Sequence, residues 1–385
     1  MDNIAGTKSS LTWAVHISVA ALVALWLFPT VGLFVSSFRT ADQIATSGWW
    51  KALFPTEQSL TLRTADPDTQ TLVDGVYVIE GNLFTGEDLS EDIDMSAWGT
   101  SSRDIGAYVP GDTAELRDGE RITVQANGEY RLESPVEMEG SRGQRIFVTA
   151  ELPPDFTLEN YQQVLFSGNA TDSMAKAFFN TLTVTIPATI IPIVVAAFAA
   201  YALAWMDFAG RALLIAIIVG LLVVPLQLAL IPLLKLHLGI GIGKGYLGTW
   251  LAHTGFGLPL AIYLLRNYMV GLPRDIIENA RVDGATEFQI FTKIILPLSF
   301  PALASFAIFQ FLWTWNDLLV AKVFLIDATG QTTVMTNQIV ELLGTRGGNW
   351  EILATAAFVS IAVPLLVFFA MQKYLVRGLL AGSVK

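Results

Sequence analysis

The chain has 385 residues, of which 53% are hydrophobic and 15% charged, and its mean hydropathy is +0.52. This composition is typical of a protein that crosses a membrane several times. Cysteine is absent, which excludes disulfides, thiol catalysis and thiolate metal sites. Residues 39–160 hold 23 acidic and 9 basic side chains, a net charge of −14, whereas the rest of the chain has a net charge of +3. The low pI therefore reflects one segment and does not indicate nucleic-acid binding.

Six apolar segments reach the length of about 20 residues that a transmembrane helix requires. They are residues 11–37, 178–205, 212–234, 247–270, 298–320 and 352–372. The first is too long for the apolar part of a secretory signal and is followed by no clear cleavage site, so we interpret it as a permanent span. Pro225 and Pro232 interrupt the third span, as is tolerated where helices line a cavity or move. The predicted fold is an all-α polytopic membrane protein with six transmembrane helices.

The acidic segment between the first two spans, residues 39–155, is predicted to be a β-rich insert. Short strand-forming runs stand at residues 75–79, 121–125, 130–133 and 145–149. Asn127-Gly128 between the second and third runs favours a hairpin, because this pair tolerates positive φ. The strand-forming part, residues 60–154, has about 95 residues, which suffice for a small independent domain. An extended loop is the alternative. A one-sided apolar stripe within residues 155–166 then predicts a short helix.

Lysine and arginine in the short loops predict the orientation of the chain. Eight of them fall on one side of the predicted membrane: Lys8, Arg211, Arg274, Arg281, Lys293, Lys373, Arg377 and Lys385. Four fall on the other side: Lys235, Lys244, Lys322 and Arg346. Cytoplasmic loops are the richer in these residues, so both termini are predicted to be cytoplasmic and the insert extracytoplasmic. The chain thus divides into residues 1–38, the insert at 39–155, and a membrane core at 156–385 with a cytoplasmic loop at 273–297 and a tail at 373–385.

The polar loop between the fourth and fifth spans carries the signals of two capped helices. Pro273 suits the first position of a helix. Gly284 stands where a helix C-terminus favours a left-handed residue. Thr286 and Gln289 have the spacing of a capping box for a second helix, and Pro297 is predicted to end it. A plain connection between two spans does not need two capped helices, so this loop is predicted to bind a partner.

Catalytic chemistry is not indicated, and neither a catalytic nor a metal site is predicted. His16, His237 and His253 are far apart in sequence and lack the spacing of a helical metal site, so each is more typical of a packing residue. Glycines 239, 241 and 243 before Lys244 do not have the spacing of a phosphate-binding loop.

The polar loop also carries a motif with fixed spacing. It reads Glu278-Asn279-Ala280, three residues, Gly284, nine residues, Ile294, one residue and Leu296-Pro297. This pattern resembles the cytoplasmic loop motif of ABC-importer permeases, with Asn279 where alanine is usual. Other stretches resemble the carbohydrate-uptake, MalG-like branch of that family: residues 156–161, 264–268, 315–317 and 374–382. The enlarged segment at 40–154 resembles permeases of the α-glucoside type.

The resemblance implies a permease subunit of an ATP-driven importer in the inner (plasma) membrane. The implied substrate is a sugar or oligosaccharide, with α-glucosides as the candidate. Its implied partners are a second, MalF-like permease, two ATPase subunits and an extracytoplasmic sugar-binding protein. The chain itself is expected to bind no cofactor and to be no enzyme, because ATP and Mg would bind to the ATPases.

The same resemblance implies that the helix around residues 276–282 lodges in a cleft of an ATPase. The implied coupling residues are Ile276, Ile277, Glu278, Asn279, Ala280, Asp283 and Gly284, with Arg377 in the tail as a second contact. An apolar face of Ile276, Ile277 and Ala280 is expected to pack on the ATPase, and Glu278 to make a polar contact.

Polar residues within apolar segments are costly and often functional. The candidates for a translocation path are Gln227, Gln310, Trp313, Asn316 and Asp317. Aromatic rings stack on sugar faces and amides pair with hydroxyls. The alternative is an aromatic belt with a polar pair that packs helices together.

Two other functions remain as alternatives. An ion-gradient-driven secondary transporter would favour inverted repeats and ionisable residues within the spans. A membrane-anchored sensor would need a cytoplasmic signalling domain. The near absence of charge within the spans and the capped loop favour the ABC-importer reading over both.

Overall fold

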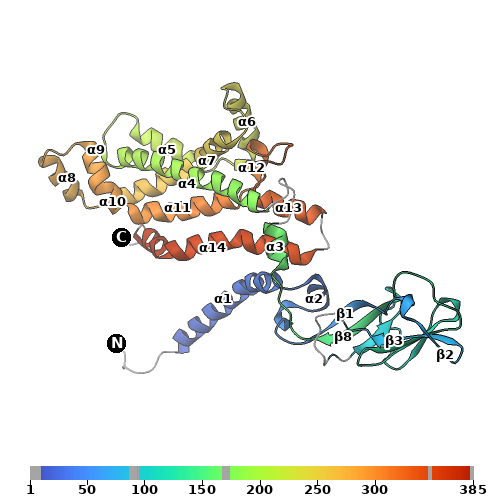
Figure 1. Cartoon of the computed structure of the whole chain (residues 1–385). Coiled ribbons are helices and arrows are strands. Elements are labelled where there is room, and N and C mark those ends of the chain that lie inside the picture. The colour runs from blue at the N-terminus through green and yellow to red at the C-terminus, as the bar shows by residue number, and fades with distance from the viewer. Residues whose placement is uncertain (1–9, 86–92, 94, 167–173, 346–348, 382–385) are drawn as a thin grey trace. The chain divides into compact units, whose positions relative to one another are not determined.

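The computed structural model describes residues 10–85, 93, 95–166, 174–345 and 349–381 (Figure 1). Two compact units make up the chain, residues 1–160 and residues 161–385, and each has its own hydrophobic core. Of the predicted charged residues, Lys8, Arg346 and Lys385 lie outside the described residues, and so does the side chain of Arg377.

In its described residues, the first unit combines one long helix with eight strands. Its helices and helical turns are α1 (Ser10–Ser36), α2 (Ala41–Thr46), η1 (Trp49–Lys51), η2 (Pro67–Thr69) and η3 (Arg117–Gly119). Its strands are β1 (Thr56–Arg63), β2 (Thr71–Val73), β3 (Val76–Asn82), β4 (Met95–Gly99), β5 (Thr113–Glu115), β6 (Arg121–Val124), β7 (Glu129–Ser134) and β8 (Arg145–Leu152). The four strand-forming runs predicted from the sequence are β3, β6, β7 and β8, so these strands are confirmed.

The strands form two antiparallel sheets. One has five strands in the order β2-β3-β7-β6-β5, and the other has three in the order β1-β8-β4. The hairpin between β6 and β7 is present, but only Gly128 in it has positive φ, at 82°. Alternate residues of β8 are buried, including Ile146 and Val148, as expected for a strand with one face on a core. Trp98 of β4 is fully buried in the same core.

The second unit is helical in the part that the structure describes. Its elements begin at the unit boundary with α3 (Glu159–Leu165) and continue as α4 (Met174–Trp205), α5 (Arg211–Leu221), α6 (Leu226–Gly239), α7 (Tyr246–Val270), α8 (Arg274–Val282), α9 (Glu287–Ile290), the π turn η4 (Phe291–Ile295), α10 (Leu296–Leu298), α11 (Phe300–Trp315), α12 (Leu319–Phe324), α13 (Met335–Thr345) and α14 (Trp350–Ala381). The long helix α4 packs along α7, and α11 lies against both α4 and α14 (Figure 1). The short helix predicted within residues 155–166 is confirmed as α3.

The helices agree only in part with the six predicted spans. Among the described residues, α1, α4 and α14 are each long and apolar enough to cross a membrane. The number rises to five if each of two bent helix pairs forms one span. The predicted fourth span is the 25-residue helix α7, which is less apolar than α1 or α4. The arrangement of six spans therefore stays a prediction.

Two predicted spans are not single helices. The third bends by 111° between α5 and α6, where Pro225 precedes the first residue of α6. The fifth bends by 70° at Ser299, and α11 ends at Trp315 rather than at residue 320. Asn316 and Asp317 consequently lie in the turn between α11 and α12, not within a helical span.

Candidate functional site

The first helix of the polar loop, α8, ends in the geometry that its sequence predicts. Gly284 has φ of 79°, and its N–H donates to the carbonyl oxygen of Arg281 at 3.0 Å. The N–H of Ala285 donates to the carbonyl oxygen of Ala280, also at 3.0 Å. These two bonds define a Schellman motif, which satisfies the last carbonyls of a helix. Pro273 lies one residue before the helix, at its N-cap, rather than at the first helical position.

The second helix begins with the predicted capping box and ends near Pro297, as predicted. The N–H of Gln289 donates to Thr286 Oγ1 at 3.3 Å, and the N–H of Thr286 donates to Gln289 Oε1 at 2.9 Å. The helix continues through the π turn and α10 and ends at Leu298, one residue after Pro297 and directly before a 70° bend.

The apolar residues of α8 divide between the core and the surface, which corrects one prediction. Ile277 is 1% exposed and Ala280 is 9% exposed, and both pack in the core of the second unit. They are therefore not on a surface that a partner can cover. The exposed apolar residues of the loop are Ile276, Val282 and Phe288, at 41%, 87% and 65%. The sequence shows that α8 has an apolar face, but which part of that face is buried depends on how the neighbouring helices pack against it.

A hydrogen-bonded network joins this loop to the C-terminal end of α4. The hydroxyl of Tyr201 donates to Glu287 Oε2 at 2.5 Å, and Arg281 Nε donates to Glu287 Oε1 at 3.0 Å. Arg281 Nη2 also donates to the carbonyl oxygen of Trp205 at 3.3 Å. These bonds, chiefly the one from Tyr201, lower the pKa of Glu287, and the bond to Glu287 raises the pKa of Arg281. The network holds α8, α9 and α4 together by charge-assisted bonds.

The polar candidates on α8 face solvent. Glu278 Oε1 accepts a bond of 2.8 Å from Arg274 Nε, and the two side chains are 55% and 79% exposed. Asn279 and Asp283 are also exposed. An exposed ion pair one helical turn apart contributes little to stability, so Glu278 can exchange Arg274 for another partner at small cost.

Gln310 and Trp313 of the candidate path meet at a narrow depression between α6, α7 and α11. It is lined by Leu226, His253, Phe256, Gly257, Gln310 and Trp313. Gln310 is 2% exposed, and its Nε2 donates to the carbonyl oxygen of Ala188 at 3.1 Å, which leaves Oε1 without a partner. A Cβ at Gly257 would lie 2.7 Å from that Oε1, so only glycine leaves room for the amide.

His253 belongs to the same group, and sequence reasoning missed it. It is 4% exposed, its Nε2 has no hydrogen-bond partner, and that atom lies 3.7 Å from Asp317 Oδ2. His253 is on α7 and Asp317 is in the turn between α11 and α12, so no spacing in the sequence could reveal the pair. His253 and Gln310, each with a buried polar atom that has no partner, therefore line one depression.

The other path candidates have different surroundings. The carboxylate of Asp317 accepts bonds from the N–H groups of Val320 at 3.2 Å and Ala321 at 3.0 Å, so it caps the start of α12. Asn316 is exposed and donates to the carbonyl oxygen of Leu312 at 2.8 Å. Gln227 is exposed on α6 and does not line the depression.

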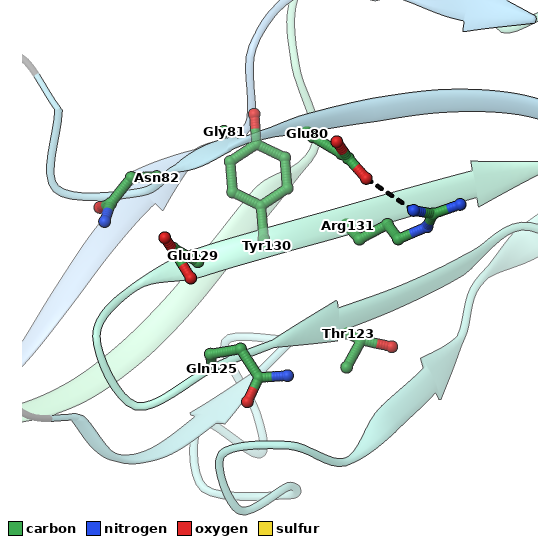
Figure 2. Close-up of a pocket in the computed structure, with 8 residues that line it drawn as sticks. All are labelled: Glu80, Gly81, Asn82, Thr123, Gln125, Glu129, Tyr130 and Arg131. Atoms are coloured by element: carbon green, nitrogen blue, oxygen red, sulfur yellow. Dashed lines mark hydrogen bonds and ion pairs between the residues drawn. The ribbon is translucent and has the colours of Figure 1, made fainter. Parts of the chain in front are cut away.

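A second hollow, of about 630 Å³, lies on the five-stranded sheet of the first unit (Figure 2). It is lined by Glu80, Gly81, Asn82, Thr123, Gln125, Glu129, Tyr130 and Arg131. Figure 2 shows Glu80 and Arg131 facing each other on neighbouring strands, and their charged atoms are 2.6 Å apart. Arg131 also pairs with Glu133 at 2.6 Å. No buried polar atom without a partner lines this hollow among the described side chains, so it has the character of a solvated sheet face.

Comparison with known proteins gives a consistent family. The model of the family described as "Binding-protein-dependent transport system inner membrane component" matches residues 166–380. The alpha-glucoside transport system permease protein AglG of Rhizobium meliloti is 61% identical over 383 residues, which is 98% of each chain. The osmoprotective compounds uptake permease protein GgtD of Synechocystis is 57% identical over 230 residues, 60% of this chain and 76% of that protein.

Among solved structures, a bacterial ABC transporter involved in the import of alginate covers 58% of this chain and 81% of its own, with 24% identity and a TM-score of 0.45. The family model alone covers more than half of the chain, and the Rhizobium protein aligns over almost its whole length. The chain therefore belongs to the family of binding-protein-dependent transport system inner membrane components.

Proposed function

We propose that this chain is a permease subunit of an ATP-driven ABC importer for carbohydrates, with α-glucosides as its substrate class. The observation that carries the proposal is the 61% identity with an alpha-glucoside permease over 98% of both chains, which includes the β-rich first unit. The capped loop with the motif spacing, anchored to the helical core, supports the same conclusion.

The proposal includes the arrangement in the membrane and the partners. Six spans place both termini and the loop at 273–297 in the cytoplasm, and the β-rich insert lies outside. A second, MalF-like permease completes the path, and an extracytoplasmic binding protein delivers the sugar. Two separate ATPase subunits bind ATP and Mg and hydrolyse the ATP, and this chain binds no cofactor.

The coupling surface is proposed to consist of the exposed residues of the capped loop. Ile276, Val282 and Phe288 provide the apolar contacts with an ATPase, and Glu278 and Asn279 provide the polar ones. Their exposure supports this assignment. The tail residue Arg377 is proposed as a second contact.

The remaining loop residues are proposed to keep that surface rigid. Ile277 and Ala280 anchor α8 in the core, and Asp283 and Gly284 form its C-terminal end. When the ATPases close, the loop moves as one body. The helix α4 then moves with the loop, because charge-assisted bonds through Glu287 connect the loop to α4.

The translocation path is proposed to include Gln310 and Trp313, with His253 as a third member. Once the depression opens, the unpaired Gln310 Oε1 and His253 Nε2 can bond to sugar hydroxyls, and the Trp313 ring, 44% exposed, can stack on a sugar face. Asp317 acts on the path indirectly, because it caps α12 and lies beside His253. Gln227 and Asn316 stay candidates on the strength of their exposure alone.

Transport by the reconstituted complex tests the proposal. Proteoliposomes with both permeases, the ATPases and the binding protein are expected to import maltose, but not cellobiose, when ATP is inside.

The substitution Val282→Asp tests the coupling surface. It places a charge at a side chain that is 87% exposed, and it is expected to abolish ATPase binding and import because the apolar contact is lost. Val136→Asp, at a 64% exposed valine of the first unit, is the matched control and should import normally. Import without ATP contradicts the function, and normal import by Val282→Asp contradicts the coupling surface.

A further inference from the structure

The chain reverses direction directly after α1, and hydrogen bonds hold the reversal in place. Arg39 is 3% exposed, and its guanidinium donates to the carbonyl oxygens of Gln43 at 2.6 Å and Ser47 at 3.0 Å. Asn160 Nδ2 donates to the carbonyl oxygens of Ser37 at 3.0 Å and Arg39 at 2.9 Å. The segment that follows α1 is therefore directed back along the helix by bonded, buried groups.

The returning segment packs on α1 through Trp49. The ring centroids of Trp49 and Phe28 are 4.7 Å apart, and those of Trp50 and Phe28 are 6.4 Å apart. A Cβ at Gly32 would lie 2.6 Å from Trp49 Nε1, so the glycine lets the indole lie against the helix. Glycine inside a helix costs about 1 kcal/mol relative to alanine, so this contact offers a structural reason for its presence.

With α1 centred on the bilayer, its contact with Trp49 gives the depth of the segment in the membrane. The apolar helix from Leu11 to Ser36 has 26 residues, about 39 Å at 1.5 Å per residue, and the hydrocarbon core is about 30 Å thick. Phe28 and Gly32 then lie about 7 and 13 Å beyond the middle of the helix. Trp49, packed on both, lies near the edge of the hydrocarbon core, where indole rings are enriched in membrane proteins.

The segment also presents an apolar, exposed surface. Trp50, Leu53 and Phe54 are 60%, 74% and 65% exposed, and Lys51 between them is exposed as well. Most side chains of α1 are likewise apolar and exposed. Lysine at this position can extend to lipid phosphates while its neighbours enter the acyl region. The first strand, β1, begins at Thr56, two residues after Phe54.

We propose that residues 49–54 are a membrane-interface anchor that lies in the lipid leaflet at the C-terminal end of α1. The lipid leaflet covers Trp50, Leu53 and Phe54. Because β1 follows directly, the anchor holds the sheets at a set height above the membrane. The depth of the anchor does not depend on which sugar is transported, so its test reads out separately from import.

Spin labels at single cysteines test the anchor, since the chain has no cysteine of its own. Leu53→Cys is labelled in the reconstituted complex, with the cysteines of the partner subunits replaced by serine. Collisions with oxygen and with a nickel chelate then give the depth of the label. Leu22→Cys, 58% exposed near the middle of α1, and Val136→Cys, 64% exposed in the first unit, are the membrane and water references.

The label at position 53 is expected to lie between the two references, with a several-fold lower nickel accessibility than the label at position 136. Accessibility equal to that at position 136 overturns the proposal. Shielding from both oxygen and nickel also overturns it, because a protein partner then covers the patch. Adding Gly32→Leu to Leu53→Cys should displace Trp49 and move the label towards water, whereas Ala21→Leu should not move it. If Gly32→Leu leaves the depth of the label at position 53 unchanged, the contact with α1 does not position the segment.

Discussion

Glu287 accepts bonds from residues of two other helices, Tyr201 of α4 and Arg281 of α8. Its bonds could not be predicted, because Tyr201 is 86 residues away in the chain and no local pattern marks either residue. The motif directs attention to Glu278, whose only described side-chain bond is an exposed one to Arg274. The sequence motif therefore identified the surface of the loop. The structure identifies Glu287 as the residue that joins this loop to the helical core.

The pH dependence of stability should reveal the bonds of Glu287. Its pKa in the folded protein is lower than the ordinary 4.5, so the ionised carboxylate stabilises the fold above pH 4.5. This contribution is lost as the pH falls through the lowered folded-state pKa. Thermal unfolding of the purified complex should thus show a gap between wild type and Glu287→Gln that is widest near pH 7 and narrows below pH 4.5. Glu278→Gln, at an exposed pair, should show little gap at any pH. A gap for Glu287→Gln that widens in acid contradicts the assignment.

At the scale of elements, local signals were predicted well and contacts between elements were not. The capping box at Thr286 and the left-handed Gly284 depend on neighbouring residues only, so their residue types sufficed. Which face of α8 is covered depends on α7, α9 and α11, and the prediction for Ile277 was therefore wrong. The effect of a proline on its helix was not predictable from the sequence either. Pro225 lies at a 111° bend, whereas Pro259 lies inside the continuous helix α7.

Substitution of Gly284 separates the backbone conformation of the α8 end from its packing. A Cβ at this position meets no atom within 4 Å, so any effect must come from the positive φ. Valine in this conformation costs about 1–2 kcal/mol, whereas asparagine adopts it more readily. Gly284→Val is expected to open the Schellman motif and raise the ATP hydrolysed per sugar imported, and Gly284→Asn to stay close to wild type. Equal ratios for the two variants in proteoliposomes would show that the motif does not serve coupling.

At the scale of the whole molecule, no described core cluster contains residues of both units. The core of the first unit is made by strands, and residues such as Ile79, Trp98, Ile122 and Val148 are all at most 2% exposed in it. Alternating patterns revealed four of its strands, because a half-buried strand has a period of two. The order of the strands was not predictable, since β1 pairs with β8, from which it is separated by all the other strands. Short strands such as β2 and β5, of three residues each, are too short to show a pattern.

This division predicts that residues 55–153 fold on their own. Thr56 pairs with Leu152, so the two ends of the fragment lie side by side. Trp98 is fully buried, and its Nε1 donates to the carbonyl oxygen of Val109 at 3.1 Å. Trp98→Ala should cost about 3–5 kcal/mol, a large part of the roughly 5–15 kcal/mol that stabilises a domain. Urea unfolding followed by circular dichroism should show a cooperative transition for the fragment, a much lower midpoint for Trp98→Ala, and nearly no change for Leu72→Ala at a 63% exposed side chain. A fragment without a cooperative transition would show that its core needs the membrane unit, and the sheets would then be no independent domain.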